Sequence, residues 1–452
     1  MPSPSARELA FDLLADGPGD EFVARRLDAA LHDSKLSPAD RRFATELVYG
    51  IVRRQATLDA LLRPLVKRPP KQVEPELWRL LRLGMYQLAF LPGVPARAAV
   101  HETVELAKRR GPSWGGFVNG VLRAATRNIT DERTTEPGPR AIPLVNGEYR
   151  LLNEPAFADP ATEPALYFAD AFSFPRWLVQ RWTPRFALEE LIRLGFWFNG
   201  VPGTSLRVNS LKIGRDEYLP RLAAAGLSAI AGSLPNAVHL EGTVRVADLP
   251  GFGEGLCTVQ DESAMQAALL LDPQPGEHIL DLCAAPGGKT THLAELMQNR
   301  GHVAAVDVSS DRLQLVDQAV RRLGLDCIAT ELCRNDLRNA PAGPFDAVLA
   351  DVPCSNTGVL GKRAEARWRI QPRDLTELPA IQARIVEVGL SRLRPGGRFV
   401  YSTCSIEPEE NRLLIDRILT SHPDLRLERE IAHRPGQPAD GGYQALLRVV
   451  RN

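Results

Sequence analysis

The ten residues 281–290, with the sequence DLCAAPGGKT, constrain the fold of this chain more than any other segment. They follow the apolar pair Ile279-Leu280 and precede a stretch with helical spacing from Thr291 to Met297. A strand, a glycine turn and a helix start place free backbone N–H groups against the polar groups of a ligand. A phosphate-binding P-loop needs glycine at position 283, which is cysteine here, and the dinucleotide fingerprint G-x-G-x-x-G is incomplete. The turn therefore predicts an α/β domain that binds a different ligand.

A carboxylate follows the turn at a spacing that suggests a bound nucleoside. Asp307 ends the apolar segment 301–306, about 20 residues beyond the glycine turn, which is the spacing at which a carboxylate reaches ribose hydroxyls. A nucleoside bound without a phosphate-binding loop suggests S-adenosylmethionine as the cofactor. A surface carboxylate at the end of an ordinary strand is the alternative, and the preceding turn disfavours it.

Two cysteines follow two further apolar strands. Cys354 comes after residues 345–350 and Asp351, and Cys404 comes after residues 398–403. The ligand crevice of a doubly wound sheet lies at the carboxyl ends of its strands, and neighbouring strands lie about 4.8 Å apart. If these strands are neighbours, both thiols point into one pocket beside the methyl donor. Other cysteines are interpreted as small buried hydrophobes: Cys257, Cys327 and Cys333.

Two thiols beside a methyl donor fit methylation of a cytosine ring at carbon 5. Carbon 5 is a poor nucleophile until a thiolate adds to carbon 6, which converts the ring into an enamine. A carboxyl group at the N3 edge stabilises this adduct, and that role suits Asp351. The attacking thiol must be ionised, so its surroundings should lower its pKa. Residue types alone leave open which cysteine attacks.

Three motifs resemble those of the RNA 5-methylcytosine methyltransferases of the Sun/Nop family. They are the segments 281–290, 351–358 (DVPCSNTG) and 401–411 (YSTCSIEPEEN). The resemblance covers nearly the whole chain and is greatest for the bacterial members that act on 16S ribosomal RNA. It implies that Cys404 is the nucleophile and that Cys354 assists release of the product.

The resemblance also assigns residues to the cofactor and to RNA. The cofactor contacts that it implies are Cys283, Ala284, Ala285, Pro286, Gly287, Gly288, Lys289, Asp307, Asp336 and Asp351. The segments 207–209 and 259–263 resemble elements that precede the catalytic domain. We expect three of their residues to face RNA: Arg207, Asn209 and Gln260. A surface charge without a ligand is an equally good interpretation of Arg207.

The N-terminal part of the chain resembles the NusB-like RNA-binding module. The segments 40–54, 83–88 and 117–123 carry this resemblance. The module separates one branch of the family from relatives that lack it, and it favours ribosomal RNA as the substrate.

The apolar pattern predicts a multidomain protein. Residues 1–130 predict an all-α domain, because apolar residues recur there at helical spacing, and the resemblance implies that this domain is NusB-like. Residues 131–164 are rich in proline and poor in periodic apolar residues, so a linker is expected. Residues 165–259 predict a small α+β domain, and residues 260–452 predict a Rossmann-like α/β methyltransferase domain. By analogy, the last strand, 445–450, runs antiparallel.

Composition limits the class of protein. The chain has 452 residues, enough for about two to three domains, and its 44% apolar and 24% charged content are ordinary for a globular protein. We find no apolar run long enough to cross a bilayer and no signal-peptide pattern. Six cysteines without C-x-x-C spacing argue against a zinc site and a secreted disulfide framework. We therefore expect a cytoplasmic, metal-free protein, and we expect a monomer.

The net charge of zero, with 55 basic and 55 acidic residues, gives no basic footprint for RNA binding. Local clusters in the N-terminal third are the candidates for phosphate contacts: Arg41-Arg42, Arg53-Arg54, Lys67-Arg68 with Lys71, and Lys108-Arg109-Arg110. A solvated helix face is the better explanation of any single cluster, so RNA binding rests mainly on the resemblance.

Two segments depart from the family pattern. Residues 361–368 (GKRAEARW) stand where bacterial relatives have an arginine-rich stretch with a proline, and residues 440–445 (DGGYQA) replace Asp-Gly-Phe-Phe. Neither segment includes the thiols or the cofactor turn. Their differences bear on the target nucleotide and the RNA contacts, not on the reaction.

Three other functions stay open at this point. The same chemistry on tRNA would use the same residues. A non-catalytic RNA-binding ribosome assembly factor would be favoured by loss of Cys404 or of the glycine turn, and both are present. Methylation of a base nitrogen or of a protein needs no second thiol, so the pair of Cys354 and Cys404 argues against it.

Overall fold

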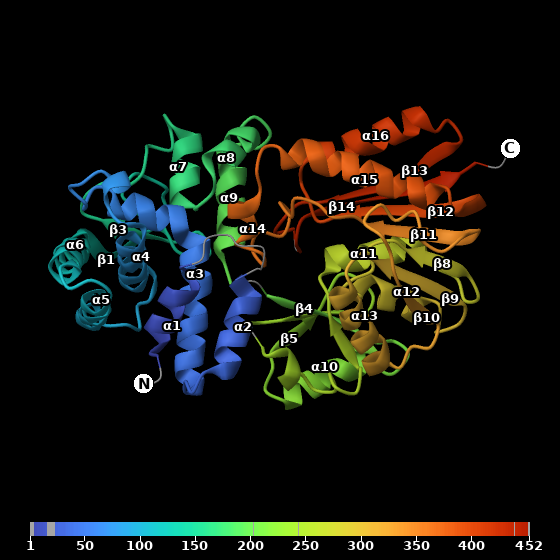
Figure 1. Cartoon of the computed structure of the whole chain (residues 1–452), viewed down its shortest axis with the longest axis horizontal. Coiled ribbons are helices and arrows are strands. Elements are labelled where there is room, and N and C mark those ends of the chain that lie inside the picture. Colours follow the sequence, from blue (N-terminus) through green and yellow to red (C-terminus); the bar gives the residue numbers. More distant parts are fainter. Residues whose placement is uncertain (1–3, 16–22, 202, 243, 438, 451–452) are drawn as a thin grey trace. The chain divides into compact units, whose positions relative to one another are not determined.

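The computed structural model describes residues 4–15, 23–201, 203–242, 244–437 and 439–450. It divides the chain into two compact units. Unit 1 comprises Met1–Gly200 and Leu360–Arg369, and unit 2 comprises Val201–Val359 and Ile370–Asn452 (Figure 1). Within the described ranges, no helix combines the length and the apolar character needed to cross a lipid bilayer.

Helices form the first part of unit 1. They are α1 (Ala6–Leu13), α2 (Val23–Asp33), α3 (Pro38–Leu62), η1 (Pro70–Gln72), α4 (Pro75–Phe90), α5 (Ala96–Arg110) and α6 (Trp114–Asn128). Helix α3 begins after Ser37, whose hydroxyl accepts a hydrogen bond from the N–H of Asp40. The face of α4 that helical spacing predicted is buried, including Leu77 and Leu81. The all-helical prediction is confirmed for the described residues of this region.

A small sheet follows where the sequence predicted a linker over residues 131–164. Its strands are β1 (Ile129–Thr134), β2 (Ala141–Pro143) and β3 (Tyr149–Leu152), in the antiparallel order β1-β3-β2. The expectation of an irregular linker is therefore wrong for this part. Ile142 and Tyr149 are buried in unit 1, and Arg54 on α3 donates hydrogen bonds to the carbonyls of Pro143 and Leu144, at 3.0 and 2.7 Å. Contacts with α3 therefore stabilise this sheet. The apolar periodicity of the sequence gives no sign of such contacts.

An aromatic core completes unit 1. It lies among α7 (Pro164–Ala171), α8 (Arg176–Trp182) and α9 (Leu188–Asn199). The packed rings include Phe168, Phe172, Phe174, Trp182 and Phe198. The boundary between the two units, at Gly200, divides the predicted middle domain, 165–259, between them.

The segment Leu360–Arg369, which ends with α14 (Ala366–Arg369), also belongs to unit 1, although unit 2 precedes and follows it in the sequence. Arg367 is fully buried there and donates hydrogen bonds to the carbonyls of Ser173 and Phe198, at 3.0 and 3.2 Å. The indole N–H of Trp368 donates to the carbonyl of Val52 at 2.8 Å. This departure from the family pattern is thus part of the packing of unit 1.

Unit 2 begins with a four-stranded antiparallel sheet in the order β5-β6-β4-β7. Its elements are β4 (Thr204–Val208), α10 (Arg215–Ala224), β5 (Ala229–Ala231), β6 (Ala237–Leu240), η2 (Val246–Asp248) and β7 (Cys257–Val259). Tyr218 and Leu222 of α10 pack with Leu206 and Val208 of β4 in one apolar cluster. A small α+β domain is therefore present, and its strands and helices lie within Thr204–Val259.

A seven-stranded sheet in the order β10-β9-β8-β11-β12-β14-β13 forms the rest of unit 2. Its strands are β8 (His278–Asp281), β9 (His302–Asp307), β10 (Ile328–Leu332), β11 (Phe345–Asp351), β12 (Leu393–Thr403), β13 (Leu425–His433) and β14 (Gly442–Val449). Strands β10, β9, β8, β11 and β12 pair in parallel, and β14 is antiparallel to β12 and β13, as predicted for the last strand.

Helices cover both faces of this sheet (Figure 1). They are α11 (Glu262–Leu271), α12 (Gly288–Leu296), α13 (Ser310–Leu323), α15 (Asp374–Leu390), η3 (Pro408–Glu410) and α16 (Arg412–Ser421). One core joins α11, α12 and α13 to Leu349 of β11, and the other joins α15 and α16 to Val348. The strand order reverses between β8 and β11, and ligands bind at such a switch point, outside the carboxyl ends of the strands.

Candidate active site

The glycine turn lies at the carboxyl end of β8, at the switch point of the sheet. Gly287 has a φ of +100°, which is favourable for glycine alone, and it immediately precedes α12. A Cβ atom at this position would lie 3.2 Å from Cα of Val316 on α13. The turn therefore needs glycine both for its backbone conformation and for its close approach to the neighbouring helix.

Carboxylates surround this turn. Asp281 is buried, its Oδ2 accepts a hydrogen bond from Thr290 Oγ1 at 2.7 Å, and its Oδ1 has no partner among the described residues. Burial raises the pKa of Asp281 to about 7. Asp307 is also buried and accepts from the N–H of Ala285 at 3.2 Å. Burial, followed by the charges of Asp281, Asp351 and Asp307, raises the pKa of the Cys283 thiol well above its ordinary value. The surroundings of the turn favour a cationic ligand.

Two of the predicted residues form an ion pair across the switch point. Lys289 Nζ lies 2.6 Å from Oδ2 of Asp351, with the two side chains 15% and 34% exposed. Lys289 belongs to the first turn of α12, and Asp351 ends β11. The structure therefore joins the cofactor turn to the strand that leads to Cys354, and it leaves the Asp351 carboxylate accessible.

Asp336 lies farther along the same edge of the sheet, after β10. Its side chain is 51% exposed, and it accepts a hydrogen bond from the N–H of Arg338 at 3.2 Å. The N–H of Cys333, three residues earlier, donates to the carbonyl oxygen of Asp307 at 2.9 Å. Asp336 is thus placed near the end of β9, with an exposed carboxylate.

The two thiols of the cysteine motifs are in contact. Strands β11 and β12 are neighbours, with Asp351 opposite Ser402, so the condition set by the sequence pattern is met. Cys354 Sγ and Cys404 Sγ lie 3.2 Å apart, and neither cysteine is part of a disulfide. The hydrogen bond with Cys404, together with burial, raises the pKa of the Cys354 thiol well above its ordinary value. Cys354 therefore holds its proton at neutral pH.

A buried glutamate connects the two cysteine loops. Glu410 accepts hydrogen bonds from the N–H of Ser355 at 2.9 Å and from the hydroxyl of Ser405 at 2.5 Å, and the hydroxyl of Ser355 also donates to it. Gln382 of α15 donates a further bond from its side-chain amide, at 2.9 Å. Burial raises the pKa of Glu410. Because Ser355 and Ser405 directly follow the two cysteines, Glu410 fixes the position of both thiols.

Sequence reasoning missed the role of Glu410. The residue belongs to the motif 401–411, but an acidic run such as Glu407-Pro408-Glu409-Glu410 is typical of an exposed helix start. Its donors come from three separate elements, and its burial depends on their assembly. A single sequence contains no local signal for that arrangement.

The C-terminal departure at 440–445 contacts the same loops. The N–H of Gly441 donates to the carbonyl of Gly358 at 2.9 Å, and the N–H of Gly358 donates to the carbonyl of Cys404 at 2.9 Å. A Cβ atom on Gly358 would lie 2.4 Å from the carbonyl oxygen of Gly441. This segment therefore supports the thiol site through a close backbone contact.

The three residues predicted to face RNA are buried instead. Arg207 is 1% exposed, pairs with Glu295 of α12 at 2.9 Å and donates to the carbonyl of Gly288 at 2.7 Å. Gln260 accepts a bond from Arg207, and Asn209 donates to the carbonyl of Gly255 at 3.0 Å. The prediction of RNA contacts is corrected to a structural role, because protein groups occupy these positions. Arg207 therefore stabilises α12, the helix that starts at the cofactor turn, through its ion pair with Glu295.

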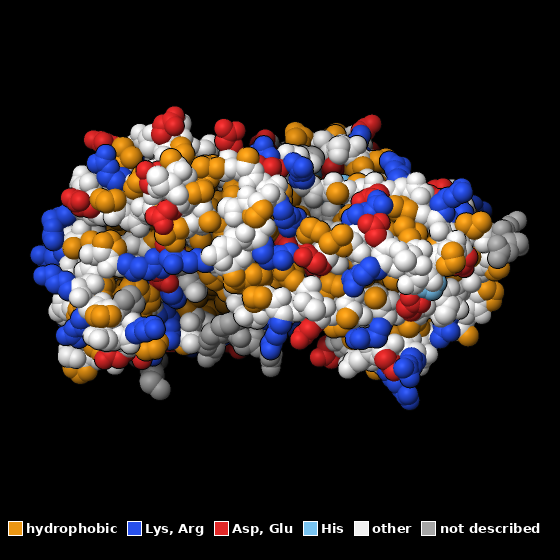
Figure 2. Space-filling view, turned by 90° about the horizontal axis from the view of Figure 1, so that it is seen from above, with side chains coloured by type: hydrophobic (Ala, Val, Ile, Leu, Met, Phe, Trp, Pro, Cys, Tyr) orange, Lys and Arg blue, Asp and Glu red, His pale blue; other side chains and the backbone are white. Residues whose placement is uncertain are grey.

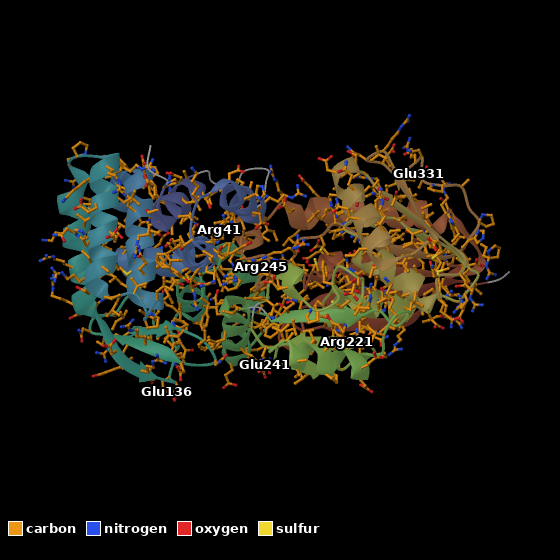
Figure 3. The ribbon with its side chains drawn as sticks, turned by 90° about the horizontal axis from the view of Figure 1, so that it is seen from below. Arg41, Glu136, Arg221, Glu241, Arg245 and Glu331 are labelled. Carbon is orange, nitrogen blue, oxygen red and sulfur yellow. The ribbon has the colours of Figure 1, made fainter. Side chains whose placement is uncertain are left out.

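Several side chains of the basic clusters identified in the sequence form hydrogen bonds or ion pairs within unit 1. Arg41, labelled in Figure 3, donates to the carbonyls of Leu36 and Ser34, at 3.1 and 2.9 Å. Arg54 is buried, and Arg110 Nη2 lies 2.6 Å from Asp12 Oδ1. Adjacency in the sequence therefore does not identify the groups that are free to contact phosphates.

Family models match three parts of the chain. Residues 268–450 match the model described as 16S rRNA methyltransferase RsmB/F. Residues 4–127 match the NusB family, and residues 174–247 match the ferredoxin-like domain of RsmF/B-like methyltransferases. Together with the observed sheets, these matches confirm the predicted fold class: a helical NusB-like domain, a small α+β domain and a Rossmann-like α/β methyltransferase domain.

Curated proteins match over nearly the whole chain. The probable ribosomal RNA small subunit methyltransferase B of Synechocystis sp. is 39% identical over 432 residues, which are 94% of this chain and 91% of that protein. The protein of the same name from Bacillus subtilis is 34% identical over 442 residues, which are 96% of this chain and 92% of that protein. A similar architecture is present in the crystal structure of PH0851, with a TM-score of 0.75, 26% identity, and coverage of 98% of this chain and 97% of that chain.

Proposed function

Because the chain belongs to the ribosomal RNA small subunit methyltransferase B family, we propose that it transfers a methyl group from S-adenosylmethionine to carbon 5 of a cytidine in 16S ribosomal RNA. One observation carries the proposal: two thiols 3.2 Å apart lie at the strand ends next to the cofactor turn. A methyl transfer to a nitrogen has no use for such a pair, whereas carbon 5 of cytosine requires a covalent thiolate adduct.

The residues at the turn fit S-adenosylmethionine. This cofactor supplies an electrophilic methyl group on a positively charged sulfur, and it also carries an ammonium group. The buried carboxyl group of Asp281, whose Oδ1 has no other partner in the described part of the chain, suits these cations, and the buried carboxylate of Asp307 suits the ribose hydroxyls. The residues that would hold the cofactor are Cys283, Ala284, Ala285, Pro286, Gly287, Gly288, Lys289, Asp307, Asp336 and Asp351.

Cys404 starts the reaction in this proposal. Its thiolate bonds to carbon 6 of the cytosine, the electron pair of the 5,6 double bond shifts to the 4,5 position, and N3 takes up a proton from water. The carboxylate of Asp351 accepts a hydrogen bond from the resulting N3–H and stabilises the adduct. The S–H of Cys354, which keeps its proton because its pKa is raised, donates to the Cys404 sulfur and stabilises the thiolate. Lys289 holds the Asp351 carboxyl in place at the end of β11.

Cys354 acts in the release of the product. Once Cys404 is bonded to carbon 6, its sulfur carries no negative charge and no longer stabilises the proton of Cys354. Burial and Glu410 still raise the pKa of Cys354, but its largest cause, the hydrogen bond with Cys404, is then lost, so this thiol can pass its proton to water. After carbon 5 has received the methyl group, the Cys354 thiolate removes the proton from carbon 5. That electron pair re-forms the 5,6 double bond, Cys404 leaves carbon 6 as a thiolate, and N3 returns its proton to water.

The thiol pair also indicates where the protein works. Two sulfur atoms in contact form a disulfide under oxidising conditions, and a disulfide would remove the nucleophile. We therefore place the reaction in the cytoplasm. Because the cofactor turn, Asp351 and both thiols belong to unit 2 of one chain, we also propose that a monomer carries it out. In this scheme residues 260–452 perform the chemistry, and the NusB-like residues 1–130 bind RNA.

Methyl transfer from labelled S-adenosylmethionine to unmodified 16S ribosomal RNA tests this function. Bisulfite sequencing then locates the product. The proposal predicts a single 5-methylcytosine that is absent with Cys404→Ala. Transfer to tRNA but not to ribosomal RNA would keep the chemistry and reject the substrate. Failure on both RNAs, with cofactor binding intact, would reject the reaction and favour an assembly factor.

A further inference from the structure

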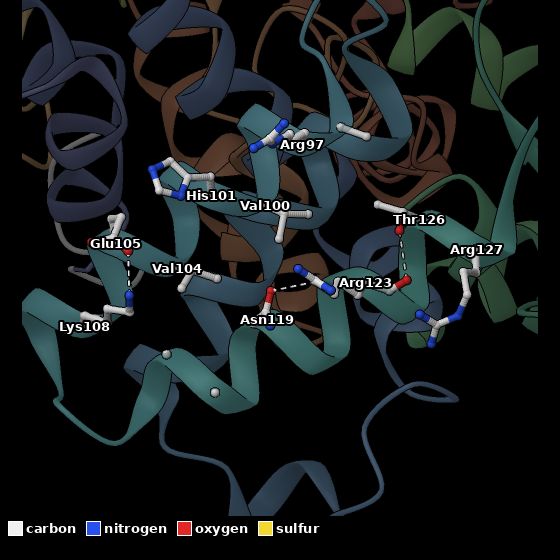
Figure 4. Close-up of a pocket in the computed structure, with 13 residues that line it drawn as sticks. Arg97, Val100, His101, Val104, Glu105, Lys108, Asn119, Arg123, Thr126 and Arg127 are labelled. Carbon is white, nitrogen blue, oxygen red and sulfur yellow. Dashed lines mark hydrogen bonds and ion pairs between the residues drawn. The ribbon is translucent and has the colours of Figure 1, made fainter.

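A groove of about 860 Å³ lies between α5 and α6 in unit 1 (Figure 4). Most of the charged side chains along it are basic, and a single acidic residue, Glu105, accompanies them. The Lys and Arg residues that line the groove are Arg97, Lys108, Arg123 and Arg127. On the face seen in Figure 2, blue Lys and Arg side chains lie over both units, and the basic character of the groove comes from its own lining residues. The groove therefore favours a negatively charged ligand.

The two helices shape the groove with small residues. A Cβ atom at Gly116 or at Gly120 of α6 would meet no other atom within 4 Å, so this side of α6 is open. A Cβ at Gly115 would lie 2.8 Å from Cγ of Lys108, so glycine lets the Lys108 side chain lie against α6. Glu105 holds the Lys108 ammonium group at 2.7 Å. These contacts keep a basic side chain along the groove.

Two guanidinium groups of the groove are available for a ligand. Arg97 and Arg127 are exposed, and neither guanidinium forms an ion pair with a carboxylate in the part of the chain that the structure describes. Each offers five N–H donors in a planar arrangement that matches phosphate oxygens. Arg123 is oriented by a hydrogen bond from its Nε to Asn119 Oδ1, at 3.1 Å. Most of its N–H groups stay available.

We propose that this groove binds the phosphodiester backbone of a double-helical segment of the RNA substrate, an inference that rests on the proposed function. Among its lining residues, all of them described, His101 carries the single ring, so groups that bind phosphate outnumber groups that could stack on unpaired bases. Double-helical RNA is recognised mainly through its phosphates and 2′-hydroxyls. Arg97 and Lys108 lie at opposite ends of α5, about 16 Å apart along the helix axis, a length that spans several phosphates.

A direct binding measurement on the full chain tests the groove. The probe is a fluorescein-labelled RNA duplex of about 16 base pairs, with its unpaired strand as the comparison. The variant Arg97→Ala/Arg123→Ala/Arg127→Ala should bind the duplex roughly 10- to 100-fold more weakly than the wild type, because phosphate contacts are lost. The slope of log affinity against log salt concentration should decrease by about 2 to 3.

Two matched variants separate charge from folding. Arg97→Lys/Arg123→Lys/Arg127→Lys keeps the charges and should retain most of the affinity. Glu105→Gln removes the acidic residue of the groove and should strengthen binding. Equal duplex affinity and salt slope for the wild type and the alanine variant would overturn the proposal, and so would an equal loss of affinity for the unpaired strand. Duplex binding that depends on the groove in a protein that methylates no RNA would support the groove and reject the proposed function.

Discussion

The sulfur atoms of Cys354 and Cys404 lie 3.2 Å apart, at the ends of two adjacent parallel strands. Both loops are held by the same buried carboxylate, that of Glu410, through the serines that follow the cysteines. The hydrogen bond between the thiols, together with burial, raises the pKa of Cys354. In the proposed mechanism Cys354 therefore keeps its proton while Cys404 attacks.

Asp351→Asn should reduce kcat by at least about 100-fold, because an amide lacks the negative charge that stabilises the protonated N3 of the adduct. Binding of S-adenosylmethionine, measured by calorimetry, should change far less than kcat. Asp346→Asn is a suitable control, since Asp346 lies at the other end of β11 and is hydrogen-bonded to Arg394. Near-normal turnover of Asp351→Asn would reject its role at N3.

Glu410→Gln should slow the reaction without weakening RNA binding. The amide accepts fewer hydrogen bonds than the carboxylate, so at least one serine donor loses its partner, at a cost of about 1 to 3 kcal/mol. We expect kcat to fall, KM for RNA to stay within experimental error, and alkylation of the cysteines by iodoacetamide to change its rate. Glu428→Gln, at an exposed position on β13, is the control. Unchanged kcat and alkylation would show that Glu410 does not position the thiols.

Arg207→Met should destabilise unit 2 by about 3 to 5 kcal/mol, because it leaves Glu295 buried without its partner. Urea unfolding measures this loss, and the double variant Arg207→Met/Glu295→Met should regain much of it. Arg221→Met is the control, since Arg221 is exposed on α10 (Figure 3) and its pair with Glu217 is worth less than about 1 kcal/mol. A weaker salt dependence of RNA binding in Arg207→Met, with unchanged stability, would contradict the structural role.

The stability of the cofactor-free protein should decrease as the pH rises from about 4 to about 7. Burial raises the pKa of Asp281 to about 7, whereas an aspartate in an unfolded chain titrates near 3.9. The folded protein therefore keeps a proton that the unfolded chain has released. The resulting loss in the free energy of unfolding between about pH 4 and about pH 7 is on the order of 4 kcal/mol. Asp281→Asn cannot ionise and should remove this component from urea unfolding curves at pH 5 and pH 8. The same pH dependence in both proteins would rule out Asp281 as its source.

The sequence predicted the parts of the site that depend on local order. The glycine turn, the strand ends at Asp307 and Asp351, and the thiol pair could be placed because parallel strands bring their carboxyl ends to one edge. The sequence left open whether β11 and β12 are neighbours, and the structure shows that these two strands pair in parallel.

Contacts between distant residues could not be predicted in the same way. The partner of Arg207 is Glu295, 88 residues away, so a buried ion pair and an RNA contact give the same sequence signal. The segment 131–164 has prolines that suggest a linker, yet Arg54 on α3 binds its carbonyls and orders it as a sheet. Glu410 is buried by donors from separate elements. In each case tertiary packing, not local pattern, decides the role.

The proposed mechanism gives the two thiols different roles, attack for Cys404 and release for Cys354. Trapping of covalent RNA tests this assignment most directly. The wild type, Cys354→Ala and Cys404→Ala are incubated with S-adenosylmethionine and unmodified 16S ribosomal RNA, and then separated on a denaturing gel. We expect Cys354→Ala to retain RNA in a covalent complex, because the thiolate that removes the carbon 5 proton is missing. We expect Cys404→Ala to form no such complex. A covalent complex with Cys404→Ala, and none with Cys354→Ala, would contradict the account and exchange the two roles.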